Sequence, residues 1–180
     1  MKRLLILSIT GLVFFSCKKE KTYHSFNEKQ LVFVNYSNDQ DLKFIDSSSI
    51  VQTIQQSQYH RDFREQVGLY GKTGVLSEEY EVAYSPGNSD LNLHISLTAW
   101  VPLVDIAFAS YQTSERLDLL NYTFPAITIN GKGYSEVYTL KVYKNGQQIN
   151  NNDTATLFHN KQFGVIQLLF PNGKKIIRTD

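Results

Sequence analysis

The feature that most constrains the fold of this chain is a strict alternation of apolar and polar residues. It is clearest at residues 91–99, where five apolar residues alternate with four polar ones. Successive side chains of a β-strand point to opposite faces of a sheet, so this pattern predicts a strand with one buried and one solvated face. Similar short segments, broken by Asn, Asp, Gly and Ser, recur from residue 31 onward. This arrangement is typical of an antiparallel sheet.

Turn residues indicate how several of these strands connect. Residues 85–90 contain Pro followed by Gly, which predicts a turn that pairs 79–84 with 91–99. An Asn-Gly pair soon follows each of the segments 134–143 and 163–170, and Asn-Gly favours the positive φ of a tight turn. The segment 163–170 is apolar on both faces, which predicts a central strand or one covered by a second layer.

The remaining pattern predicts an all-β, mainly antiparallel fold. A first hairpin is expected from 31–36 and 41–45. We expect at most two short helices, one of them capped by Ser114 before residues 115–120. The other follows from helical spacing at three apolar residues, Tyr59, Phe63 and Val67. We therefore predict one domain over residues 30–180, either a β-sandwich or a half-barrel.

Composition limits the class of protein. Hydrophobic residues make up 42% of the 180 residues, enough to bury a core, and the formal net charge is +1. Binding to nucleic acid requires a clustered excess of Lys and Arg, so nucleic acid is not an expected partner. A single cysteine excludes an internal disulfide and any site made of several thiolates.

The N-terminus has the pattern of an export signal. Lys2 and Arg3 precede the mostly apolar run 4–15, whose 12 residues are too few to cross a bilayer. The run ends at Phe14-Phe15-Ser16-Cys17, which resembles the lipobox of bacterial lipoproteins, although Phe14 and Phe15 depart from its common residues. The resemblance implies cleavage before Cys17 and acylation of its sulfur, and acyl chains hold a soluble domain on a membrane. The alternative is a plain signal peptide followed by an unmodified cysteine.

This interpretation divides the chain into a signal peptide (1–16), a lipidated cysteine with a polar tether (17–29) and the β domain (30–180). Loss of residues 1–16 leaves 16 basic and 17 acidic residues, so the mature chain is nearly neutral. The tether begins with Lys18-Lys19-Glu20-Lys21, which resembles in part the surface-export signal of Bacteroidota lipoproteins. A tether that faces the periplasm fits the same residues, so the side of the membrane stays open.

The C-terminal half also carries a resemblance. The segments 128–138, 157–166 and 172–174 contain an NGK-x-Y-x-x-V-Y pattern, a GVI strand and a final NGK turn. Together they resemble small envelope lipoproteins of Bacteroidota whose function is unknown. The resemblance implies a β domain anchored in the bacterial cell envelope, on the outer membrane, and it transfers no catalytic residue.

The sequence contains no pattern that predicts catalysis, a cofactor or a metal. Its four histidines, His24, His60, His94 and His159, are far apart and form no recognised ligand motif. His94 is expected to be a solvated residue on the polar face of its strand. Glu79 and Glu81 would share a strand face beside Glu78, and a glycosidase needs two carboxylates across a cleft. We interpret these acids as charges on an exposed strand edge instead.

Aromatic and hydroxyl residues provide the candidate binding and modification sites. Trp100 follows the alternating strand and is a candidate for the rim of a carbohydrate-binding face, although its position favours a plug at the end of the core. Further candidates for a ligand face are Tyr111, Tyr122 and Tyr143. Asp153-Thr154-Ala155 resembles the O-glycosylation site of Bacteroidota envelope proteins, which implies Thr154 as the acceptor.

The sequence therefore predicts an envelope lipoprotein that acts as a non-enzymatic binding or assembly module. Its expected partners are the membrane, through the lipid anchor, and an envelope protein, a glycan or a lipid. The first alternative is a carrier that holds an apolar ligand on a concave sheet. The second is a divergent hydrolase whose site is assembled from scattered residues, because fold and function are only loosely tied.

Overall fold

The computed structural model describes residues 20–180 except 38, 87–90 and 148–150. Over these residues the prediction of an all-β, mainly antiparallel domain is confirmed. The strands are β1 (Thr22–His24), β2 (Leu42–Asp46), β3 (Val51–Gly68), β4 (Gly71–Pro86), β5 (Leu93–Thr98), β6 (Val101–Phe108), β7 (Tyr111–Arg116), β8 (Phe124–Ile129), β9 (Lys132–Lys144), β10 (Thr154–Asn160), β11 (Gly164–Leu169) and β12 (Lys175–Arg178). The helices are α1 (Glu28–Leu31) and a single 3-10 turn, η1 (Asn151–Asp153).

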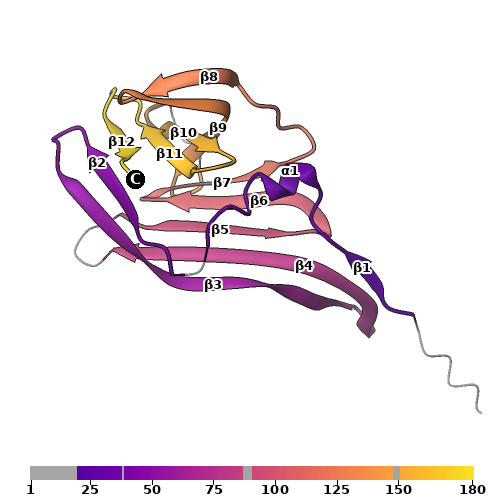
Figure 1. The fold of residues 1–180 in the computed structure, drawn as a ribbon. Helices are drawn as coiled ribbons and strands as arrows, with labels where there is room; N and C mark the ends of the chain where they lie inside the picture. Colours follow the sequence, from indigo (N-terminus) through magenta and orange to yellow (C-terminus); the bar gives the residue numbers. More distant parts are fainter. Residues whose placement is uncertain (1–19, 38, 87–90, 148–150) are drawn as a thin grey trace, which may run out of the picture.

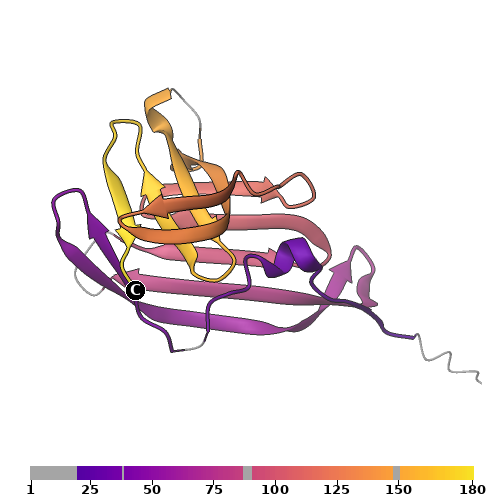
Figure 2. The ribbon, with the colours of Figure 1, turned by 45° about the horizontal axis from the view of Figure 1, so that its top comes forward.

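The strands form a closed barrel. Ten of them follow the order β4-β3-β2-β12-β11-β10-β9-β7-β6-β5, and a β4–β5 pairing closes the circle. Every neighbouring pair in this circle is antiparallel. The other two strands lie outside it: β1 pairs in parallel with β4, and β8 pairs with β9. Figures 1 and 2 show the long β3 and β4 on one side of the barrel and β8 on another.

The alternating strand lies as predicted. In β5 the apolar residues Leu93, Ile95 and Leu97 are buried and the intervening polar ones are partly exposed. The expected pairing of 79–84 with this segment is confirmed, because β4 and β5 pair throughout these residues. Burial of alternate side chains on one side of each strand builds the core inside the barrel.

The prediction for the late apolar strand is also confirmed. Strand β11 lies between β10 and β12, and the Asn-Gly turn after it forms the β11–β12 hairpin. Val165 and Leu168 pack inside the barrel, whereas Ile166 packs into a second apolar cluster on the outer side. A second layer forms this cluster: β8 pairs with the first half of β9, and the phenyl ring of Phe124 stacks at 6.1 Å on that of Phe158 from β10.

The predicted first hairpin is wrong. Residues 31–36 form no strand, and β2 pairs with β3 instead. Asn27 and Gln30 form a capping box, in which each side chain accepts a hydrogen bond from the backbone N–H of the other residue. The box starts α1, and the apolar residues after it, including Phe33, turn into the barrel core. The end of the expected tether is also ordered, because β1 and the start of α1 lie within 22–29.

Both predicted short helices are wrong. Tyr59, Phe63 and Val67 lie on β3, and Ser114 lies on β7. A spacing of four residues is even, so it places side chains on one face of a strand as well as on one face of a helix. Residues 59–67 form a strand and not a helix, because β3 pairs with β4 along nearly the whole length of β4.

Strands β3 and β4 are much longer than their neighbours and form an arm. Strand β2 pairs only with residues 51–54 of β3, and β5 pairs only with residues 79–84 of β4. Beyond these contacts the two long strands continue as a hairpin that ends at Gly68 and Gly71. Figure 1 shows this hairpin projecting past the barrel, with β1 beside it.

Candidate functional site

A row of polar side chains crosses the outer surface of the barrel. Strand register places five residues opposite one another on five neighbouring strands, and we call them the polar row: His60, Glu81, Ser96, Asp105 and Ser114. On the three central strands of this row, the residues on either side in the sequence are buried in the core, as Val104 and Ile106 are beside Asp105. Because side chains of a strand alternate, the polar row points to the outside.

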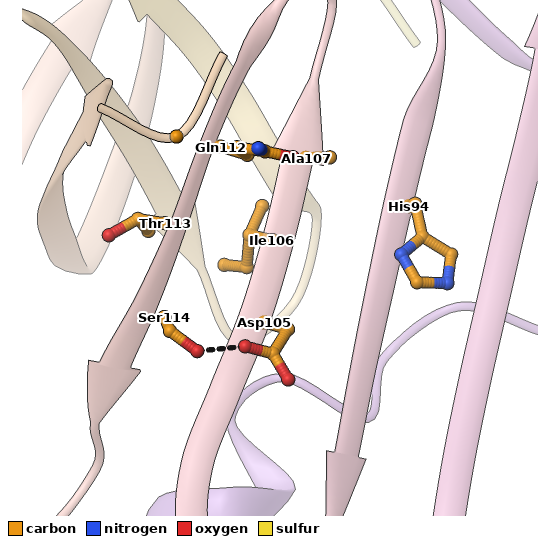
Figure 3. A pocket seen from close by; sticks show the side chains of 8 residues that line it. His94, Asp105, Ile106, Ala107, Gln112, Thr113 and Ser114 are labelled. Atoms are coloured by element: carbon orange, nitrogen blue, oxygen red, sulfur yellow. Dashed lines mark hydrogen bonds between the residues drawn. The ribbon is translucent and has the colours of Figure 1, made fainter. Parts of the chain in front are cut away.

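Two ordered contacts hold side chains on this surface. The ring Nε2 of His94 lies 3.0 Å from Oε1 of Glu81. The hydroxyl of Ser114 donates a hydrogen bond to the carboxylate of Asp105, which Figure 3 shows between β7 and β6. His94 points out of β5 away from this second pair (Figure 3). The two carboxylates therefore keep a fixed orientation while remaining accessible.

Two hollows flank the polar row, and Asp105 lines both. The first is about 370 Å³ and is lined by His94, Asp105, Ile106, Ala107, Gln112, Thr113, Ser114 and Gly146. The second is about 330 Å³ and is lined by His60, Glu79, Tyr80, Glu81, Ser96, Leu97, Thr98, Val101, Leu103 and Asp105. In the sheet, His94 lies opposite Ala83 on one side and Ala107 on the other. These small side chains leave open space around the imidazole ring.

The chemistry of this surface favours binding. Carboxylates accept hydrogen bonds, and hydroxyl and imidazole groups both donate and accept them. An activated serine would need a base within hydrogen-bond reach, and His94 contacts Glu81 while Ser114 contacts Asp105. Among the residues that the structure describes, no group of three or more His, Cys, Asp or Glu side chains could hold a metal ion.

The three clustered glutamates separate into two environments. Glu79 and Glu81 share the outer face of β4, as predicted. Glu78 lies on the opposite face, where its carboxylate accepts hydrogen bonds from the backbone N–H of Phe26 at 2.9 Å and from Arg61 at 3.0 Å. The interpretation of these acids as a strand edge is wrong, because β4 lies between β3 and β5.

The aromatic candidates do not form one face. Trp100 is 53% exposed in the turn between β5 and β6, so it lies at the surface and the interpretation as a core plug is wrong. Its indole ring lies 4.9 Å from the His24 ring, edge to face. Tyr122 is exposed, but Tyr111 is buried against Phe170. Tyr143 is half-buried on β9, where it pairs with β7 and β10.

Of the two predicted modification sites, Cys17 and Thr154, only Thr154 lies among the described residues. Cys17 lies outside the described residues, so its acylation stays a prediction. Thr154 begins β10, and its hydroxyl oxygen is buried with no hydrogen-bond partner among the described residues. Glycosylation of Thr154 stays a prediction, and this burial means that a transferase would have to act before the strand is fully packed.

The barrel interior holds a second group of polar residues that the sequence did not predict as a set. Both ring nitrogens of His159 are buried without a described partner, and burial lowers the pKa of this imidazole to about 3, with Arg178 adding to the effect. Tyr36 is also buried, and its hydroxyl accepts a 2.6 Å hydrogen bond from the backbone N–H of Val165. Burial raises the pKa of the Tyr36 phenol. These side chains, with Phe33 at 4.4 Å from the His159 ring, occupy the interior space that a carried ligand would need.

Sequence reasoning missed most of the polar row. The signal was present in 103–107, where Leu103, Asp105 and Ala107 alternate with buried residues. Only the register between five strands shows that the polar positions align.

Comparisons with known proteins add no family. The chain matches no protein-family model, no curated protein and no solved structure. No helix in the described part of the chain is long and apolar enough to span a bilayer.

Proposed function

We propose that this chain is a lipoprotein of a bacterial cell envelope, anchored on the outer membrane by acylated Cys17, and that its barrel is a non-enzymatic binding module for a glycan. The polar row is the observation that supports glycan binding. It offers carboxylate, hydroxyl and imidazole groups in register across five strands. A hydroxyl-rich ligand donates to carboxylates and accepts from the other groups.

Two further features support a sugar ligand. The two hollows are open to solvent and share Asp105, so a ligand that extends along the polar row can contact both. Trp100 lies in the turn between Thr98 and Val101, and both of these residues line the second hollow. An exposed indole beside hydrogen-bond acceptors provides a surface on which a sugar ring can stack. Acidic side chains on the same face disfavour phosphate-rich ligands.

The test is binding of the purified protein to immobilised oligosaccharides and to isolated peptidoglycan sacculi. A double variant, Glu81→Gln with Asp105→Asn, should weaken glycan binding about tenfold or more, since each hydrogen bond to a charged group contributes about 1.5–3 kcal/mol. The matched control, Glu20→Gln with Glu28→Gln, removes the same charge from exposed positions away from the row. Absence of binding by the wild-type protein, or equal loss in both double variants, would contradict the proposal.

A further inference from the structure

The arm ends in large apolar side chains that nothing in the described chain covers. Leu69 is 98% exposed and Tyr70 is fully exposed, and Val67 beside them is 74% exposed. We call these three residues the arm tip. A hairpin end in water is usually polar, and exposed apolar groups gathered at one place mark a contact site.

The N-terminal strand places the anchor near this tip. Strand β1 runs parallel to β4, with Thr22 opposite Val75. Because the two strands run in the same direction, the chain before Thr22 leads toward the same end of the arm as the chain before Val75. The tip turn ends at Gly71, four residues before Val75, and Cys17 is five residues before Thr22. An extended chain covers about 3.5 Å per residue, so Cys17 can reach the level of the arm tip.

The charges at this end of the molecule fit a lipid surface. Near the tip, Arg64 and Lys72 form ion pairs with Glu79 and Glu65, and their side chains remain 74% and 76% exposed. The hydrogen bond from Lys72 is the main cause that lowers the pKa of the Glu65 carboxyl. The charge of Lys21 lowers the same pKa further, so Lys21 also lies near the tip. The sequence adds Lys18 and Lys19 directly after the anchor position. Basic side chains near a bilayer are attracted to anionic lipid headgroups.

We propose that the arm tip inserts into the headgroup region of the same membrane that holds acylated Cys17. The inference rests on the anchor in the proposed function. Apolar and aromatic side chains flanked by basic ones bind at this depth of a bilayer. The lipid anchor and the arm tip then make two contacts, which fix the orientation of the barrel on the membrane.

The experiment uses the full chain, produced with its own signal, extracted from membranes and reconstituted into liposomes of phosphatidylethanolamine and phosphatidylglycerol. Trp100→Phe removes the single tryptophan, and Tyr70→Trp then places one at the tip. The matched control is Ile50→Trp in the same background, because Ile50 is 57% exposed just before the opposite end of β3. Quenching of tryptophan by lipids brominated on their acyl chains reports contact with the membrane.

The inference predicts that brominated lipids reduce the emission of tryptophan at position 70 by about half, the effect expected for a side chain about 5–10 Å into the interface, and leave position 50 unchanged. Equal quenching at both positions, or none at position 70, would overturn it. A tip that is unquenched in liposomes but shielded from iodide in native membranes would also overturn it, in favour of a protein partner. Failure of the anchor is distinguishable, because the wild-type chain would then not float with the liposomes.

Discussion

The buried imidazole of His159 should make the fold sensitive to mild acid. Its pKa is about 3 in the folded chain because burial opposes the charged form, whereas a histidine in the unfolded chain titrates near its ordinary value of about 6.5. A folded-state pKa below the unfolded one means that the unfolded state takes up the proton first. The stability is therefore fully present above about pH 6.5 and is lost as the pH falls toward 3.

The size of the effect follows from the two pKa values. At about pH 5 the unfolded state gains about 2 kcal/mol from protonating this one imidazole, while the folded state stays neutral. The same linkage contributes less than about 0.1 kcal/mol at pH 7.5, and it reaches a limit of about 5 kcal/mol only below pH 3. Water does not screen the imidazole in the folded state, because the ring is fully buried.

The pH-dependent loss of stability is measured by urea unfolding of the wild type and of His159→Leu at about pH 7.5 and pH 5. Leucine has a similar volume and does not titrate, so the wild type should lose about 2 kcal/mol more than the variant between these conditions. The exposed His60 provides the control, and His60→Gln should show the wild-type pH dependence. If His159→Leu lost as much stability in acid as the wild type, the assignment of a buried neutral imidazole would be refuted.

Three other predictions test the packing. Gly164→Ala should lower the free energy of unfolding in urea by about 1–3 kcal/mol more than Gly173→Ala does. Both glycines have a positive φ, which an alanine adopts only with strain. Only at position 164 would the added Cβ also collide with the Tyr36 ring. Equal losses would refute the close contact. Tyr36→Phe should lower the free energy of unfolding by about 1–2 kcal/mol, because a buried N–H loses its acceptor. Glu78→Leu should cost about 1–3 kcal/mol for the same reason, and a neutral outcome in thermal denaturation would contradict the role of this carboxylate.

The sequence predicted the parts of the fold that are written in local pattern. Alternation placed β5 and its pairing with β4, and the Asn-Gly turn placed the β11–β12 hairpin. A run of apolar residues such as Leu31–Val34 carries no such information, because it fits a strand or a buried loop equally well. In the structure residues 32–34 of this run form a loop, because their side chains pack into the barrel core. The capping box at Asn27 was the local sign that a helical turn comes before this loop.

The candidate site was harder to predict because it depends on register between strands. Asp105 and Ser114 are nine residues apart and face each other across β6 and β7, while His60 is far from both in the sequence. Closure of the barrel through β4 and β5 brings these positions into one row, and no local pattern specifies closure. Trp100 shows the same limit, since its exposure depends on how the β5–β6 turn leaves the barrel.

The anchor at Cys17 is the claim on which both the localisation and the membrane contact of the arm tip depend. Intact-mass spectrometry of the chain purified from its own membranes tests it directly. We expect a polypeptide from Cys17 to Asp180 that carries the added mass of two or three acyl chains. A chain that retains residues 1–16, or one cleaved elsewhere with an unmodified cysteine, would contradict it.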